Sequence, residues 1–150
     1  MRRRGFLATL AGFGAAALGR PAIAQSPVEN GMGAIVLDLT GGAPVQEGRV
    51  ALQLPRLADN GTSVPLKVSV QSPMTATDRV VSLSLISPRN PRPLMATFHF
   101  GEDSPRAEVM TRVRLNGTQR VLAIARMSDG SFWSATSEVE VTESACLDAS

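Results

Sequence analysis

The chain has 150 residues, of which 15 are Lys or Arg and 13 are Asp or Glu. Four of the arginines and none of the acidic residues lie in the first 24 positions, so the remainder carries 11 basic and 13 acidic groups, a net charge of −2. This balance gives no reason to expect nucleic-acid binding. The part beyond position 24 is long enough for one domain with a real core.

The first 24 residues have the layout of an export signal. Three arginines precede an apolar stretch at 6–18, and a small-residue triplet, Ala-Ile-Ala, occupies 22–24. The pair Arg3-Arg4, followed by Gly-Phe-Leu, resembles the twin-arginine (Tat) signature. We therefore expect residues 1–24 to be a Tat signal peptide, with a Sec signal or a lipid-facing anchor as the alternative, and a periplasmic mature protein that starts at Gln25. No other apolar run is long enough to span a bilayer, so we expect no membrane contact after cleavage.

Residues 29–40 precede a Gly41-Gly42 pair and fit two structures. A short helix would end at these glycines, since glycine is frequent at helix C-termini. The stretch "AIVLDL" within the same range also has the composition of a strand. The sequence leaves both interpretations open.

From residue 49 onward, apolar residues alternate with polar ones, as in strands that are buried on one face. Seven segments have this alternation: 50–54, 66–70, 81–85, 94–100, 107–115, 120–127 and 131–141. Asn-Gly and Asp-Gly dipeptides provide turns between them, and the prolines of "SPRNPRP" exclude a central strand at 87–93. The pattern predicts an all-β, immunoglobulin-like antiparallel sandwich of about seven strands over residues 25–142, and a flexible tail at 143–150.

The sequence offers few catalytic candidates. His99 is the one histidine, and on a strand it points away from Phe98 and Phe100, so a half-exposed strand residue is favoured over a general base or metal ligand. The methionines are not clustered, and core packing explains them. Trp133 suits core packing or an interface anchor. We therefore expect no stand-alone enzyme, cofactor or metal site.

Cys146 is the one cysteine, and it lies in the polar segment "VTESACLDAS". A single thiol cannot form an internal disulfide, so in an oxidising compartment it pairs between molecules or reacts. A thiolate can hold a sulfur species through an S–S bond, and a thiol on a tail can reach several enzymes. Cys146 is therefore the candidate site of covalent sulfur attachment, and an incidental tail residue is the alternative.

Several blocks of the chain resemble one family. The stretches "NGTSVPL", "SPMT", "NPRP", "ATFHF", "RLNGTQ" and "MSDGSFW" look like the SoxY family, the sulfur-carrier proteins of periplasmic thiosulfate oxidation. The resemblance covers residues 41–142 and implies a sandwich that forms a heterodimer with a second immunoglobulin-like protein, SoxZ. The resemblance also implies a reason for the Tat leader on a chain without a cofactor. Tat exports folded proteins, so a folded partner that has no leader of its own can be exported across the membrane together with this chain.

In that family the tail is Gly-Gly-Cys-Gly-Gly, and its cysteine bears the sulfur intermediates. The resemblance implies that a c-type cytochrome enzyme couples thiosulfate to the cysteine and that a hydrolase then releases sulfate. Here Ser144-Ala145 and Leu147-Asp148 flank Cys146, so the cysteine matches and none of the four glycines does. Side-chain bulk restricts the tail, and like-charge repulsion from Glu143 and Asp148 disfavours the thiolate.

Two functions follow from this comparison of residues. The first is a non-catalytic, periplasmic sulfur-carrier subunit that holds thiosulfate-derived intermediates on Cys146. The second is a SoxY-like heterodimerising module that has lost the carrier chemistry, so that its thiol is inert or forms an intermolecular disulfide. A stand-alone enzyme or metal carrier has only His99 and scattered methionines in its favour.

Overall fold

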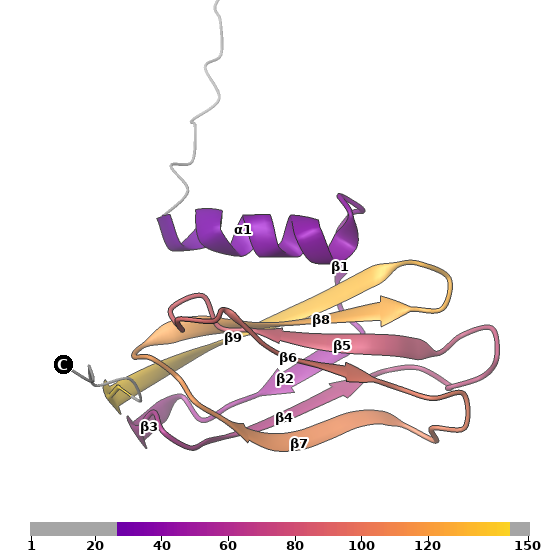
Figure 1. Cartoon of the computed structure of the whole chain (residues 1–150). Coiled ribbons are helices and arrows are strands. Elements are labelled where there is room, and N and C mark those ends of the chain that lie inside the picture. Colours follow the sequence, from indigo (N-terminus) through magenta and orange to yellow (C-terminus); the bar gives the residue numbers. More distant parts are fainter. Residues whose placement is uncertain (1–26, 145–150) are drawn as a thin grey trace, which may run out of the picture.

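The structure, a computed structural model, describes residues 27–144, with side chains from Met32 onward. The expected signal peptide, residues 1–24, and the tail segment 145–150 with Cys146 lie outside the described residues. The described part contains one helix and nine strands (Figure 1): α1 (Pro27–Thr40), β1 (Val45–Glu47), β2 (Val50–Gln53), β3 (Leu57–Asn60), β4 (Val64–Val70), β5 (Val80–Ile86), β6 (Leu94–His99), β7 (Ala107–Val113), β8 (Gln119–Met127) and β9 (Phe132–Glu143). Within residues 27–144, no helix is both long enough and apolar enough to cross a membrane.

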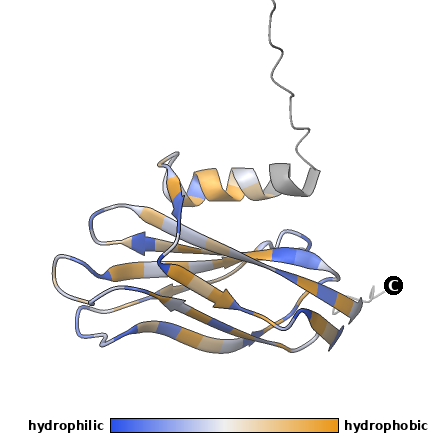
Figure 2. Ribbon diagram, turned by 180° about the vertical axis from the view of Figure 1, so that it is seen from behind, coloured by the Kyte–Doolittle hydropathy of each residue, from blue (hydrophilic) through white to orange (hydrophobic). Residues whose placement is uncertain are grey.

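The strands form two sheets that pack face to face (Figure 1). The larger sheet has the order β1-β9-β8-β5-β6, with β3 also paired to β9, and the smaller sheet has the order β2-β4-β7. Apolar and polar residues alternate along the strands (Figure 2), so each strand of the smaller sheet turns one apolar face inward. The core between the sheets includes Val64, Leu66 and Val68 of β4, packed with Leu83 and Leu85 of β5. The predicted all-β sandwich is confirmed.

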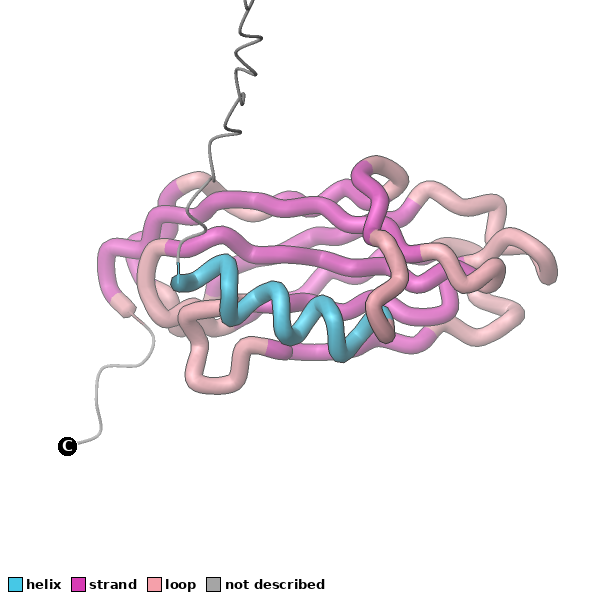
Figure 3. The backbone as a smooth tube through the Cα atoms, turned by 90° about the horizontal axis from the view of Figure 1, so that it is seen from above, coloured by secondary structure: helices cyan, strands magenta, loops and turns pink. Residues whose placement is uncertain are grey.

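Helix α1 lies across the outer face of the larger sheet (Figures 1 and 3). Its apolar residues recur at helical spacing and pack on a second buried cluster that the sheet provides. The cluster consists of Ile86, Leu122, Ile124 and Phe132, and the helix contributes Met32, Ile35, Val36 and Leu39. Gly41 and Gly42, with φ of 62° and 84°, end the helix in the left-handed region. Of the two interpretations that the sequence left open for this segment, the helix is right.

The structure contains two strands that the alternation did not predict. Strand β1 has three residues and β3 has four, and neither contains an alternating set of buried apolar residues, since only Ala58 of the two strands is buried. Both pair in parallel with β9, β1 near its beginning and β3 near its end. The long strand β9 therefore carries a short parallel partner at each end, while the ladders among the other strands are antiparallel.

Candidate functional site

The candidate site is the end of the sandwich from which the cysteine-bearing tail departs. Strand β9 runs to Glu143, whose carbonyl accepts a hydrogen bond from the amide of Gly61 at 2.7 Å. The hydroxyl of Ser144, the last described residue, donates a hydrogen bond to Oδ1 of Asn116. Cys146, the predicted attachment site, follows two residues later and lies outside the described residues. The chain is thus held in place up to a point two residues before its thiol.

Asn116 and Asn90 join two loops beneath Ser144. The amide of Asn116 donates to Oδ1 of Asn90 at 2.8 Å, and Nδ2 of Asn116 donates to the carbonyl of Arg89 at 3.2 Å. Nδ2 of Asn90 in turn donates to the carbonyl of Arg114 at 2.7 Å. The loop between β5 and β6 and the loop between β7 and β8 therefore form one unit at the root of the tail.

A buried pair of polar side chains supports this unit from inside the sandwich. The fully buried hydroxyl of Ser87 donates to Oε1 of Gln119 at 2.6 Å, and the same oxygen accepts from the amide of Arg89 at 3.1 Å. Nε2 of Gln119 donates to the carbonyl of Gly117 at 3.2 Å. Within the described chain, no buried side-chain nitrogen or oxygen lacks a partner, which is the condition for a polar network to be rigid.

The turn at Asn116-Gly117 connects this unit to β9. Gly117 has a φ of 81°, a conformation that glycine adopts without strain. Nη1 of Arg89 donates to the carbonyl of Thr118 at 2.7 Å. The hydroxyl of Thr118 accepts from the amide of Val141 at 3.0 Å. This turn is therefore bonded directly to the strand that ends in the tail.

The opposite end of the sandwich carries a cluster around Arg49, which has a φ of 50°. Its guanidinium nitrogens lie 3.2 and 3.3 Å from the carboxylate of Asp78, and its Cζ lies 5.4 Å from the ring centroid of Trp133. Hydrogen bonds from the Ser131 hydroxyl and amide lower the pKa of Asp129, and the positive charge of Arg49 adds to the effect. Trp133 is half-buried and packs against the core at this end of the sandwich, which is one of the two roles expected for it.

His99 is an exposed residue at the last position of β6. Its backbone pairs with Ser82. Among the side chains that the structure describes, no group of three or more His, Cys, Asp or Glu residues lies close enough to hold a metal ion.

Sequence reasoning identified the thiol but gave no role to the residues that hold the root of its tail. Asn90 belongs to the block "NPRP", and Asn116, Gly117 and Gln119 belong to "RLNGTQ". Both blocks were noted only for their resemblance to the SoxY family. Each block has an asparagine directly before a turn-forming residue, Pro91 or Gly117, and this was the available signal. Only the strand order brings the two blocks together at one end.

The chain is similar to known proteins in sequence and in fold. Residues 36–146 match the family described as "Sulfur oxidation protein SoxY". No curated protein sequence matches the chain. Among solved structures, the sulfur carrier protein SoxY from Chlorobium limicola f thiosulfatophilum is 26% identical and has a TM-score of 0.63, with 76% of this chain and 98% of that chain covered.

Two less similar structures share the fold alone. The superoxide reductase (neelaredoxin) from Ignicoccus hospitalis is 17% identical, with a TM-score of 0.55 and coverage of 63% of this chain and 80% of that chain. A putative superoxide reductase from Thermotoga maritima is 14% identical, with a TM-score of 0.57 and coverage of 70% and 98%. The family match spans well over half of the sequence and includes the single cysteine. The chain belongs to the SoxY family of sulfur oxidation proteins.

Proposed function

We propose that this protein is a sulfur carrier that holds the intermediates of thiosulfate oxidation covalently on Cys146. The observation that carries the proposal is the position of this thiol in the chain. Strand β9 and Ser144 are bonded to a rigid end of the sandwich, and the one cysteine follows two residues later. Membership of the SoxY family supports the same role, since its member from Chlorobium limicola is a sulfur carrier protein.

The carrier chemistry needs only a thiolate from this chain. In the first step the Cys146 thiolate and the outer sulfur of thiosulfate form an S–S bond, and the two electrons released pass to a c-type cytochrome enzyme. In the second step a hydrolase directs water to the sulfonate sulfur. The bond between that sulfur and its neighbour breaks, sulfate leaves, both water protons go to solvent, and a persulfide stays on Cys146. The catalytic groups belong to the partner enzymes, so the protein itself is non-catalytic.

The proposal includes a heterodimer with a SoxZ-like protein in the periplasm, reached through the Tat pathway. Strands β2, β6 and β7 each pair on one side only. Such unpaired strand edges are places where a second immunoglobulin-like domain docks or must be excluded. The twin arginines of residues 1–24 are the basis for the proposed route.

A heterodimerising module without carrier chemistry is the second candidate, and one contact favours it. The Ser144 hydroxyl bonds Asn116 at a place where the family's tail has glycine, which has no side chain to form this bond. The bond restrains the tail just before Cys146, and Leu147 and Asp148 add bulk and charge just after it. These features oppose entry of the thiol into narrow active sites.

The intact mass of the mature protein, isolated from its own periplasm during thiosulfate oxidation, separates the two functions. A carrier has a thiosulfonate or persulfide adduct that maps to the Cys146 peptide and disappears with reductant. Cys146→Ser should abolish the adduct while partner binding persists. An unmodified thiol, or a plain disulfide between protein chains, would favour the module.

A further inference from the structure

Strand β9 has an unpaired stretch along one of its edges. On the side away from β8, it pairs with β1 over residues 132–134 and with β3 from residue 140 to residue 143. Within the described chain, residues 135–139 pair with β8 alone. This stretch, which we call the β9 gap, is a free strand edge in the middle of the longest strand.

The β9 gap exists because the chain leaves the larger sheet after β1 and returns to it only at β3. At the exit, Gly48 and Arg49 have φ of 109° and 50°, and these positive values turn the chain out of the sheet. The chain then forms β2, which pairs with β4 in the smaller sheet, and it rejoins β9 at Leu57. The chain thus bypasses the middle of β9 and leaves it uncovered.

Backbone groups of alternate residues point into the β9 gap. In an antiparallel pair, every second residue directs its N–H and C=O to the partner strand, and the residues between direct theirs away. The amide of Glu140 donates to the carbonyl of Arg56, on the side away from β8, at 2.8 Å. By this alternation the N–H and C=O of Thr136 and Glu138 also point away from β8, and no described strand pairs with them there. These backbone groups are therefore available for hydrogen bonds.

Two hollows border the β9 gap, and Thr136 lines both of them. The larger has a volume of about 800 Å³ and is also lined by Leu54 and Ser137. The smaller has a volume of about 240 Å³ and is also lined by Val50 and Ala135. The β9 gap therefore has free volume beside its backbone, which an added strand requires.

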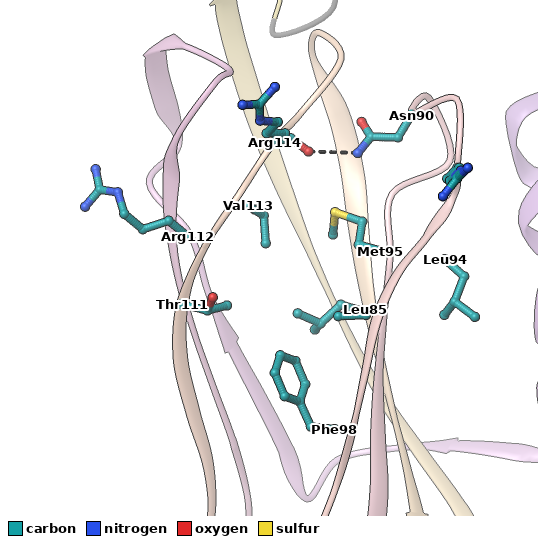
Figure 4. Close-up of a pocket in the computed structure, with 11 residues that line it drawn as sticks. Leu85, Asn90, Leu94, Met95, Phe98, Thr111, Arg112, Val113 and Arg114 are labelled. Atoms are coloured by element: carbon teal, nitrogen blue, oxygen red, sulfur yellow. Dashed lines mark hydrogen bonds between the residues drawn. The ribbon is translucent and has the colours of Figure 1, made fainter.

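The opposite edge of the larger sheet, at β6, has a different character. Figure 4 shows the side chains of Leu85, Met95, Phe98 and Val113 in the space between β6 and β7. The hollow on that side has a volume of about 420 Å³, and its charged lining residues are all arginines. That side therefore favours an apolar or acidic occupant, and the β9 gap is distinct from it in place and in charge.

The β9 gap carries acidic side chains. Glu138 and Glu140 line the larger hollow and Glu47 lines the smaller one, against a single lining arginine, Arg56, and all four are exposed. Glu138 forms an ion pair with Arg120 at 2.9 Å. Glu47 and Glu140 form no ion pair with a described residue. Their carboxylates are therefore available to the cationic side chains of an occupant.

We propose that an extended segment of a partner protein pairs with β9 along residues 135–139, with basic residues at alternate positions and an apolar residue between them. Its backbone bonds the N–H and C=O of Thr136 and Glu138, as in β-strand addition. Because alternate side chains of a strand face opposite ways, its basic residues lie beside Glu138 and Glu140, and the apolar residue between them faces Leu54. This inference goes beyond sulfur carriage and does not depend on any adduct.

Hydrogen–deuterium exchange, measured by NMR on the mature chain from Gln25, tests the proposal with the peptide Lys-Val-Lys-Val-Lys as the probe. In the free protein, the amides of Thr136 and Glu138 should exchange several-fold faster than that of Ser137, which faces β8. Saturating peptide should slow Thr136 and Glu138 several-fold and leave Ser137 unchanged. Two control peptides should have no effect: Glu-Val-Glu-Val-Glu reverses the charge, and Lys-Pro-Lys-Pro-Lys keeps the charge but loses backbone donors.

Four exchange outcomes would overturn the proposal. Unchanged exchange at Thr136 and Glu138 up to the solubility limit of the probe would show that the β9 gap takes no strand of this kind. Equal protection by Lys-Pro-Lys-Pro-Lys would mean that charge alone attracts the probe, and equal protection by Glu-Val-Glu-Val-Glu would mean that charge has no part. Slower exchange in the free protein at higher protein concentration would mean that a second copy of this chain fills the gap.

A pair of double variants tests the role of the two glutamates. Glu138→Gln with Glu140→Gln should weaken the protection by Lys-Val-Lys-Val-Lys several-fold, because it removes the negative charge beside the lysines. Glu102→Gln with Glu108→Gln is the matched control, since these exposed glutamates lie in the loop after β6 and on β7, away from the gap. Equal loss of protection in the two double variants would contradict recognition by Glu138 and Glu140.

Discussion

The hydroxyl of Ser144 donates a hydrogen bond to the side-chain oxygen of Asn116, a residue 28 positions earlier in the chain. Asn116 is itself bonded to Asn90, so the last described residue is tied to two loops at once. A glycine at position 144, as the family's tail pattern implies, removes the only side chain that forms this bond. The tail of this protein therefore starts from a residue whose side chain is bonded to the sandwich.

Replacing the four residues that flank the thiol with glycine should speed sulfur transfer. The changes are Ser144→Gly, Ala145→Gly, Leu147→Gly and Asp148→Gly, which remove the bond to Asn116, the bulk and the negative charge. In a reconstituted thiosulfate-oxidising system, we expect a several-fold rise in the rate of thiosulfate-dependent cytochrome reduction. Ala149→Gly with Ser150→Gly is the matched control. An unchanged rate in the four-glycine variant would mean that the residues flanking Cys146 do not limit the rate of sulfur transfer.

Removing either asparagine at the root of the tail should destabilise the sandwich. Asn90 accepts from the Asn116 amide and donates to the Arg114 carbonyl, and loss of such bonds costs about 1–2 kcal/mol. Asn90→Ala and Asn116→Ala should each lower the free energy of unfolding by about that amount. The double variant should lose less than the sum, because the side chains of both residues hold the same two loops together. Urea denaturation measures all three.

Asn60→Ala is the control for this pair. Its side chain accepts only the amide of Thr62, two residues away and at the surface, so we expect a loss below about 0.5 kcal/mol. Strictly additive losses at Asn90 and Asn116 would indicate that the two loops are not one unit.

The sequence predicted the strands well where one face of a strand is buried, and less well elsewhere. Strand β4 alternates as expected, with Val64, Leu66 and Val68 buried. In β5 the alternation placed Val81 in the core, yet Val80 is the fully buried residue. A register shift between Val80 and Ser82 changes which side chain faces inward. A bulge of this kind depends on the partner strand, so the sequence of β5 alone does not reveal it.

The candidate site was only partly predictable for a related reason. The thiol was evident because the chain has one cysteine. The asparagines that hold the root of its tail are 26 positions apart and meet only because β5, β6, β7 and β8 place their connecting loops at the same end. Contacts between distant loops depend on the order of the strands in the sheets, and this order cannot be predicted from a local sequence pattern.

Gly117 and Gly33 should respond in opposite directions to alanine. Gly117 has a φ of 81°, and a Cβ added there would lie 3.6 Å from the guanidinium of Arg89. Gly117→Ala should therefore lower the free energy of unfolding by about 1 kcal/mol or more, because alanine is strained at positive φ. Gly33 lies in α1 with no atom near an added Cβ, so Gly33→Ala should stabilise the protein by about 0.5–1 kcal/mol. Thermal unfolding compares the two, and a loss of equal size at both sites would refute the role assigned to the turn.

Asp129 should make the stability of the native protein depend on pH in the acidic range. The hydroxyl and amide of Ser131 donate to its carboxylate at 2.6 and 2.8 Å, and these bonds lower its pKa below the ordinary value of 3.8. A lowered pKa in the folded state means that the ionised carboxylate stabilises the fold above pH 3.8. That contribution is lost as the pH falls through the folded-state pKa.

Asp129→Asn should therefore be less stable than the native protein at neutral pH, and the difference should shrink as the pH falls below 3.8. Urea midpoints measured from neutral pH down to the acid range check this. Ser131→Ala is the matched variant, since it keeps the carboxylate but removes the hydroxyl that contributes most to the shift. Its Asp129 resonance should titrate at higher pH than in the native chain. A difference between native and Asp129→Asn midpoints that stays constant with pH would mean that the carboxylate's charge does not contribute to stability at this turn.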